Sequence, residues 1–151
     1  MHSYTQDVTD ADDLLRLDNQ LCFALVTAAR NVVAIYRPIL EPLGLTHPQY
    51  LVMLALWERA PRSLNDLAAD LALDPATVSP LVKRLEADGL LARRRSTDDE
   101  RRLDIVLTDA GQELRDKALD VPPQVMAAVG MDASEISALR DALQPFAGRR
   151  S

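Results

Sequence analysis

The stretch of residues 74–107 constrains the fold most, because a helix with well-marked ends is followed at once by a predicted hairpin. Asp74 is a good N-cap residue, and Pro75 suits the first helical turn, where no backbone donor is needed. Gly89 favours the left-handed conformation that ends a helix. The sequence therefore predicts a helix between Asp74 and Gly89, with a local irregularity at Pro80, which lacks a backbone donor.

This predicted helix has an apolar face and an outer face that is small, polar and basic. The residues on the apolar face are Val78, Leu81, Val82 and Leu85. The outward residues are Ala76, Ser79, Pro80, Lys83, Arg84 and Ala87, with Thr77 at the margin. Short side chains near a helix N-terminus let its backbone approach a DNA major groove, while hydroxyl and amino groups reach base edges and phosphates. A solvated helix face is the alternative that this helix alone leaves open.

The neighbouring segments favour the DNA interpretation. Residues 63–71 predict a short helix that only two residues separate from Asp74, which is typical of a helix-turn-helix. Residues 90–95 and 103–107 have strand character, and the polar loop 96–102 between them predicts a hairpin. We therefore expect a mainly α fold built on a winged helix-turn-helix.

The charge distribution supports a DNA-binding surface, although the chain as a whole is acidic. Its 151 residues, 48% of them hydrophobic, suffice for one folded domain. The formal net charge is −6 and the pI is near 4.8, whereas DNA-binding domains are usually basic. Between Lys83 and Arg102, however, seven Lys or Arg residues face five acids. The basic charge is concentrated in the predicted motif.

An amphipathic helix is predicted before the motif. Apolar residues recur every three or four positions over residues 14–39, which predicts one long helix, bent or ended at Arg37-Pro38. A stripe this long carries more apolar surface than one small core covers, so part of it is expected to contact another subunit. Thr46 should cap a second helix over residues 47–59. The residues along one side of that helix are Tyr50, Leu54 and Trp57.

Further helices are predicted after the motif. Thr108 should cap a helix that Pro122-Pro123 breaks or kinks. Asp132 and Glu135 have capping-box spacing and open a last helix. The apolar stripe of the last helix is Ile136, Leu139, Leu143 and Phe146. Helical stripes at both ends of the chain fit a dimer made by the terminal helices.

Positions inside and outside the motif form a pattern that is typical of a known family. Outside the motif they are residues 17–25, 36–46, 48–54 and 56–58. Inside it they are Leu73-Asp74, Thr77, Pro80-Leu81, Lys83-Arg84-Leu85-Glu86, Asp99-Glu100-Arg101 and Leu107-Thr108. With these residues the chain resembles the organic-hydroperoxide-sensing, OhrR-type branch of the MarR transcriptional regulators. The resemblance covers residues 14–120, and the run Leu-Asp-Asn-Gln-Leu-Cys-Phe (17–23) points to the branch.

The resemblance implies a homodimeric repressor that binds double-stranded operator DNA. It implies one MarR-like domain over residues 1–151, with dimerisation helices at 14–45 and 109–147 and a winged helix-turn-helix lobe at 46–108. The operator should be near-palindromic, with half-sites about one duplex turn, roughly 34 Å, apart. No cofactor is expected.

The resemblance also implies which residues contact DNA. Thr77 and Ser79 are candidates for base edges, Lys83 and Arg84 for bases or phosphates, and Arg101 for a minor groove. Local charge adds three weaker candidates, which are Arg93, Arg94 and Arg95.

Cys22 matches the family's peroxide-sensing cysteine. A thiol reacts with peroxide as the thiolate, so a sensing cysteine needs hydrogen-bond donors or positive charge nearby and access for the peroxide. The sulfenic acid that forms condenses with another thiol or is oxidised further. Because Cys22 is the only cysteine, that thiol would belong to a low-molecular-weight compound or another protein. The alternative is a small buried hydrophobe on a helix.

The family holds its sensing cysteine with tyrosine hydroxyls that reach across the dimer. Tyr36 matches one of these tyrosines, but Val26 and His47 occupy the positions of the others. A neutral His47 could donate a hydrogen bond, and a protonated one could supply charge. A solvated histidine at a helix start is the alternative. These departures concern the activation of Cys22 and its oxidant, and not DNA binding.

Other functions are weighed against this one. A MarR-type regulator could instead respond to a small apolar or phenolic ligand bound between the dimer helices and the DNA-binding lobes. An enzyme is disfavoured because the sequence lacks a nucleophile elbow, a phosphate-binding glycine loop and zinc-ligand spacing. Two histidines and one cysteine also disfavour a metal site. A pure protein-interaction module would not explain Arg101 on a wing beside a basic helix.

The expected location is the cytoplasm. One cysteine excludes an intramolecular disulfide and fits a reducing compartment. The start of the chain lacks a signal pattern, and no membrane-spanning stretch is expected.

Overall fold

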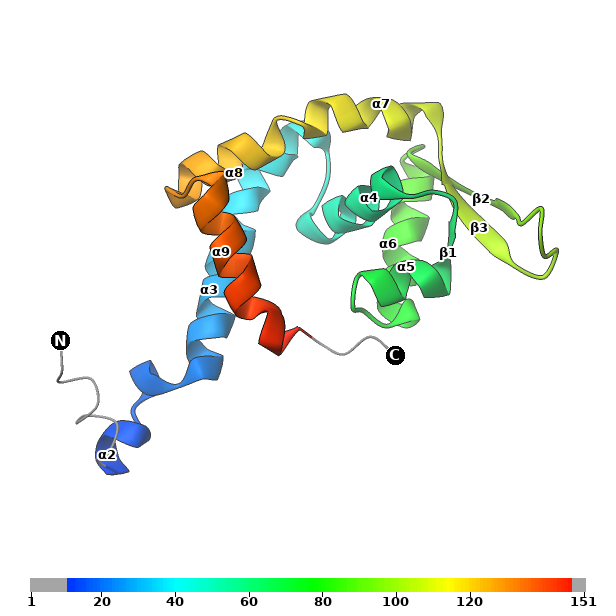
Figure 1. Ribbon diagram of the computed structural model, residues 1–151. Helices are drawn as coiled ribbons and strands as arrows, with labels where there is room; N and C mark the ends of the chain where they lie inside the picture. The colour runs from blue at the N-terminus through cyan, green and yellow to red at the C-terminus, as the bar shows by residue number, and fades with distance from the viewer. Residues whose placement is uncertain (1–10, 148–151) are drawn as a thin grey trace. The chain divides into compact units, whose positions relative to one another are not determined.

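The computed structural model describes residues 11–147 (Figure 1). The chain divides into two compact units, Met1–Ile35 and Tyr36–Ser151, and each unit is considered by itself. Within the described residues, the predicted mainly α fold with a small antiparallel sheet is confirmed.

The amino-terminal helices differ from the prediction. They are α2 (Ala11–Leu14), the 3-10 helix η1 (Leu17–Asn19) and α3 (Leu21–Leu40). The long helix therefore begins at Leu21 and not at Leu14. Gln20 is extended, and its side-chain amide donates to the carbonyl oxygens of Leu14 and Arg16 at 2.9 and 2.8 Å. These bonds compete with continuous helix.

Helix α3 is not ended by its internal proline. It continues through Pro38 to Leu40, so an end at residues 37–38 is wrong. Contrary to the sequence expectation, the stretch Leu21–Leu43 is long and apolar enough to cross a membrane by length and composition alone. Phe23, Val26 and Val32 are exposed in the single chain. One such helix is weak evidence for a span, because a helix covered by a second protein subunit has the same composition.

The second unit contains the winged motif and the carboxyl-terminal helices (Figure 1). In chain order its elements are η2 (Glu41–Leu43), α4 (His47–Glu58), β1 (Arg62–Ser63), α5 (Leu64–Asp70), α6 (Pro75–Ala87), β2 (Leu91–Arg95), β3 (Leu103–Leu107), α7 (Asp109–Ala118), α8 (Val121–Val129), α9 (Ala133–Leu143) and η3 (Gln144–Phe146). Every helix and both hairpin strands that were predicted for this unit are present, with ends shifted by a few residues.

Helix α6 shows which end signals act as expected. Asp74 takes the N-cap position, but its side chain accepts no capping hydrogen bond. Pro75 occupies the first turn, and Gly89 follows the helix with a φ of 81°. The helix runs through Pro80 without a break, so the predicted irregularity does not interrupt it. Pro75 and Gly89 therefore mark the two ends of the helix as predicted, although Asp74 makes no capping hydrogen bond.

The sheet has the order β1-β3-β2, and both pairs are antiparallel. In the hairpin, Leu91 pairs with Leu107 and Arg95 with Leu103. Strand β1 was not predicted, because two residues are too short to show an alternating pattern. Its Arg62 lies opposite Ile105 of β3.

The predicted break in the helix after Thr108 is present, but it lies slightly earlier than expected. The chain leaves helix at residues 119–120, and Pro122 and Pro123 lie in the first turn of α8. A missing N–H has no cost there, because the first turn's amides have no partners within the helix. The capping box of Asp132 and Glu135 is confirmed at the start of α9.

One core in the second unit joins α4, the winged motif, α7 and α8. Its largest fully buried side chains are Leu40, Met53, Leu56, Leu67, Leu85, Leu91, Ile105, Val52, Val78, Val82 and Val121. Trp57 packs against this core and donates its indole N–H to the carbonyl oxygen of Gly111 at 2.9 Å. Gly111 also lies against the hairpin, since a Cβ atom there would be 2.1 Å from the carbonyl oxygen of Leu90. Helix α7 is thereby held close to the start of β2.

The close approach at Gly111 gives a stability test. Alanine normally favours a helix over glycine by about 1 kcal/mol. At Gly111 the added methyl would overlap backbone, and overpacking typically costs about 1–3 kcal/mol. We expect Gly111→Ala to lower the urea midpoint at fixed protein concentration, while Gln112→Ala, an exposed neighbour, changes stability by less than about 0.5 kcal/mol. An unchanged or raised midpoint for Gly111→Ala would contradict the packing.

Candidate nucleic-acid interface and thiol site

Helices α5 and α6 form the helix-turn-helix. Ser63 caps α5 by accepting a hydrogen bond from the amide of Asp66. The turn to α6 includes Ala72 with a φ of 56°, a left-handed conformation in a residue other than glycine. Residues 71–74 therefore reverse the chain within a single tight turn, which brings the start of α6 beside α5.

The predicted faces of α6 are largely confirmed. Val78, Val82 and Leu85 are at most 1% exposed. Thr77, Ala76, Lys83 and Arg84 are exposed, whereas Ser79 is half-buried. Thr77 and Ser79 thus exchange the places expected for them, since Thr77 was placed at the margin and Ser79 outward. The exposed face offers a short hydroxyl near the helix start and cations further on.

One ion pair joins the wing to α6. Arg93 of β2 donates to the Glu86 carboxylate at 2.9 Å, and this hydrogen bond holds the pKa of Glu86 below its usual value. Arg84 lies 3.6 Å from Asp88, the residue that follows α6. Within the wing, Arg95 donates to the backbone oxygen of Glu100 at 2.6 Å. Each of these three arginines therefore has a partner within the chain.

Residues 96–104 hold the loop of the wing in a defined shape. Ser96 is 4% exposed, and its hydroxyl accepts from the amides of Asp98 and Asp99 at 3.2 and 3.4 Å. Arg102 donates to Ser96 and, at 3.1 Å, to the buried carboxylate of Asp104. Sequence analysis missed Ser96 and Asp104, although a serine before two aspartates is a known turn signal.

Three of the predicted DNA-contacting cations remain exposed and have no side-chain hydrogen bond or ion pair within the described residues 11–147. They are Lys83 on α6, Arg94 on β2 and Arg101 at the wing loop. The backbone amide of Arg101 donates to the Asp99 side chain at 3.0 Å, and this bond does not use the guanidinium. The structure therefore separates the free cations from those that have a partner within the chain.

Cys22 belongs to the first unit and occupies the first turn of α3. It is exposed within its own chain, so burial of this thiol would have to come from a second subunit. Val26, one turn later, is 45% exposed.

Tyr36 and His47 come together in the second unit. Their ring centroids are 5.2 Å apart in an edge-to-face arrangement, and Tyr36 also lies 6.0 Å from Tyr50. Burial lowers the pKa of His47, and burial followed by the nearby Tyr36 raises the pKa of Tyr50. The lowered pKa of His47 disfavours its protonated form, so this ring favours offering a hydrogen bond over a cation.

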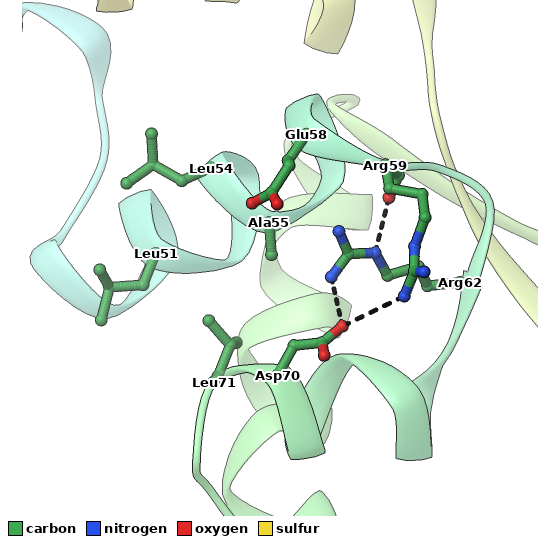
Figure 2. Close-up of a pocket in the computed structure, with 8 residues that line it drawn as sticks. All are labelled: Leu51, Leu54, Ala55, Glu58, Arg59, Arg62, Asp70 and Leu71. Atoms are coloured by element: carbon green, nitrogen blue, oxygen red, sulfur yellow. Dashed lines mark hydrogen bonds and ion pairs between the residues drawn. The ribbon is translucent and has the colours of Figure 1, made fainter. Parts of the chain in front are cut away.

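The second unit has three cavities of interest. The largest, about 530 Å³, lies against Arg62 and Asp70 (Figure 2). A second of about 280 Å³ is lined by Trp57 and Leu119, among others, and a third of about 280 Å³ by Tyr36 and its neighbours. Among the residues that the structure describes, no three His, Cys, Asp or Glu side chains are grouped to hold a metal ion.

A tight turn between α5 and α6, a basic outer face and a tied wing together define a winged helix-turn-helix DNA-binding protein. Residues 34–118 match the family of SarA/Rot transcriptional regulators. The chain belongs to this MarR-like winged-helix family of transcriptional regulators, as its resemblance to the OhrR-type branch predicted.

Curated relatives agree with this assignment. The chain is 38% identical over 131 residues to the organic hydroperoxide resistance transcriptional regulator of Bacillus subtilis, covering 87% of this chain and 89% of the relative. It is 44% identical over 135 residues to the HTH-type transcriptional regulator TtmR of Methylorubrum extorquens, covering 89% and 69%.

Solved structures show the same fold. AbfR of Staphylococcus epidermidis is 34% identical, with a TM-score of 0.72 and coverage of 89% of this chain and 93% of that chain. AbfR has been solved on DNA in reduced and overoxidised forms, and also in a disulfide form. BpsR of Bordetella bronchiseptica, whose DNA binding is regulated by 6-hydroxynicotinic acid, is 28% identical with a TM-score of 0.77 and coverage of 87% and 95%.

The free guanidinium of Arg101 gives a DNA-binding prediction. If it meets a phosphate, Arg101→Ala should lower the slope of log affinity against log salt by about 0.9. If it enters a minor groove, the variant should instead lose A/T preference at that position. Fluorescence anisotropy with a duplex selected from random sequences measures both. Arg140→Ala, an equal charge change at an exposed position of α9, should leave the salt slope and the A/T preference unchanged. If Arg101→Ala also leaves both unchanged, Arg101 does not contact the DNA.

The lowered pKa of His47 gives a pH prediction. Unfolded His47 has the ordinary pKa of about 6.5. Between that value and its lower folded pKa, the unfolded chain binds more protons, so stability falls as pH falls through this range. Above about pH 6.5 His47 is neutral in both the folded and the unfolded chain, so its full contribution to stability is present. The melting temperature of the wild type should therefore drop more between pH 7.5 and pH 5 than that of His47→Gln. An equal drop in the two proteins would contradict the lowered pKa of His47.

Proposed function

We propose that the protein is a homodimeric repressor that leaves its operator when organic hydroperoxide oxidises Cys22. The observation that carries the proposal is an exposed cysteine in the first turn of α3, in a chain 38% identical to an organic hydroperoxide resistance regulator. The reduced and overoxidised forms of AbfR on DNA support redox chemistry in a similar regulator.

The proposed reaction starts from the Cys22 thiolate. Its sulfur attacks one oxygen of the hydroperoxide, the O–O bond breaks, and the alkoxide leaves and takes a proton to become an alcohol. The sulfur is oxidised to sulfenic acid while the peroxide is reduced. A low-molecular-weight thiol then forms a mixed disulfide with the sulfenic acid and releases water. In this proposal Tyr36 and His47, whose rings are in contact, supply hydrogen-bond donors for this sulfur from the partner subunit.

Exposed apolar side chains support the dimer. On α3 they include Val32 and Val33, and at the other end of the chain Leu139, Leu143 and Phe146 are 49%, 39% and 56% exposed. Large apolar side chains left exposed on a single chain support an interface, because their contact with water is unfavourable. We assign the terminal helices to a two-fold interface that presents two α6 helices to successive major grooves.

In this assembly Thr77, Lys83 and Arg84 face the major groove, and Arg101 of the wing faces the minor groove. The side chain of Arg84 is 70% exposed, so it can exchange its ion pair with Asp88 for a contact with DNA. Arg94 adds a free cation, whereas Arg93 and Arg95 keep their internal partners and Ser79 lies too deep for a main role. The repressor acts in the cytoplasm, where its DNA target lies. It is a regulator and not an enzyme.

Replacing the thiol tests the proposal. Cys22→Ser should bind the selected duplex with unchanged affinity, because the change is isosteric and lies outside the DNA-binding motif. Cumene hydroperoxide should release the wild type from the duplex and leave the variant bound. Intact mass of the released wild type should show one added oxygen, or one glutathione when that thiol is present. Release of Cys22→Ser at the wild-type rate would exclude the thiol.

A second candidate is control by a small aromatic or phenolic ligand. A ligand is named for two structural relatives. DNA binding by BpsR is regulated by 6-hydroxynicotinic acid, and CouR of Rhodococcus jostii has been solved bound to p-coumaroyl-CoA. The cavity beside Trp57 and Leu119 is mostly apolar and suits such a ligand. Peroxide-insensitive DNA binding together with thermal stabilisation by an aromatic acid would favour this candidate.

A further inference from the structure

The turn between α5 and α6 decides how α6 is placed in the winged motif. The amide of Ala72 donates to the carbonyl oxygen of Ala69 at 3.2 Å. The amide of Leu73 donates to the carbonyl oxygen of Ala68 at 3.0 Å. This pair of bonds is a Schellman motif, whose left-handed residue is usually glycine. Here that residue is Ala72, with a φ of 56°. Because alanine disfavours this conformation, contacts outside the turn have to hold it.

A buried arginine holds the residue just before this turn. Asp70 is the last residue of α5, and its carboxylate accepts a hydrogen bond from Nη1 of Arg62. The side chain of Arg62 is only 5% exposed, and its Nε donates to the carbonyl oxygen of Arg59 at 2.7 Å (Figure 2). Two bonds from one planar guanidinium therefore fix the end of α5 to the segment that follows α4.

The other charged groups around Arg62 are closer to water. Arg59 lies 3.6 Å from Asp70, but its side chain is 68% exposed. Glu58 is exposed too, and Figure 2 marks no bond between it and either arginine. The two arginines and the two acids balance in formal charge. The contact between Arg62 and Asp70 is therefore the one in this group that solvent screens least.

Arg62 also belongs to the sheet that carries the wing. With Ser63 it forms β1, and it pairs with Ile105 of β3. Strand β3 in turn pairs with β2, which carries the free cation Arg94. The backbone of Arg62 thus lies in the wing sheet, while its side chain holds the end of α5. One residue connects the two elements that present cations to DNA.

We propose that Arg62 is a positioning residue for DNA recognition. Through Asp70 it fixes the turn between α5 and α6 against the wing sheet, so that α6 and Arg101 meet one duplex together. A buried ion pair adds little net stability, because the cost of removing two charges from water offsets their attraction. What this pair adds is a fixed geometry. The inference rests on DNA binding by the winged motif, which the proposed function requires, and it does not involve Cys22.

The test compares a duplex selected from random sequences with a scrambled duplex of equal length, by fluorescence anisotropy at one salt concentration. Arg62→Met keeps a long side chain in the buried position and removes both hydrogen bonds. The ratio of the two affinities should fall about tenfold, roughly the value of one base-reading contact. Affinity for the scrambled duplex should stay unchanged, because the exposed cations still meet phosphates. A loss of stability alone would lower both affinities equally and leave the ratio unchanged.

Arg59→Met is the matched control, since it removes the exposed arginine from the same carboxylate, and it should leave the ratio unchanged. Asp70→Ala should lower the ratio as Arg62→Met does. The double variant should lose no more than the larger single change, because both changes remove one bond. Circular dichroism first establishes that each variant folds. If Arg62→Met does not fold, Asp70→Ala decides, since the Asp70 side chain is partly exposed.

An unchanged ratio in the folded variants, or an equal fall in Arg59→Met, would overturn the positioning role. Losses that add in the double variant would overturn it as well. If selection yields no duplex that the wild type prefers, the proposed repressor is contradicted and the positioning role with it. None of these measurements uses hydroperoxide, so the sensing role of Cys22 is tested separately.

Discussion

The rest of the structure depends on the packing of three side chains of α6, Val78, Val82 and Leu85. They are at most 1% exposed and lie in the core that α4, α5 and β2 share with α6. Fully burying a side chain of this kind contributes roughly 1.5–3 kcal/mol. Because these residues recur at helical spacing, burying them fixes the rotation of the helix about its axis. That rotation turns Thr77 and Lys83 outward.

The wing is positioned by different forces. Backbone pairing places β3 between β1 and β2, and this ladder sets the direction of the hairpin. The ion pair between Glu86 and Arg93 is about one-third exposed on each side, and pairs of that kind contribute little, about 0–1 kcal/mol. The buried Asp104 matters more, because losing Arg102 would leave its carboxylate without its partner. Direction thus comes from the sheet, and the shape of the loop from Ser96, Arg102 and Asp104.

The sequence could predict whatever depends on near neighbours in the chain. The faces of α6, the Gly89 stop and the capping box of Asp132 follow from spacing alone, and all are present. It could not predict contacts between distant residues, such as Gly111 against Leu90. The cavity at Arg62 was missed for the same reason, since α4, β1 and α5 each contribute one part of it. Local signals also failed where two of them competed. The apolar pattern of residues 14–39 favours one continuous helix, but the side-chain amide of Gln20 bonds to the backbone before it, and α3 begins only at Leu21.

An acidic chain can bind DNA because repulsion and attraction act over different distances. The formal charge of −6 is spread over the molecule, and salt at physiological strength screens such charges beyond about 8 Å. The free cations Lys83, Arg94 and Arg101 lie on the motif itself, so they act at contact distance. DNA that approaches any other side of the protein gains no contact with these cations and is repelled by the acidic surface. The acidic remainder therefore disfavours non-specific association, and productive binding requires the winged motif to face the duplex.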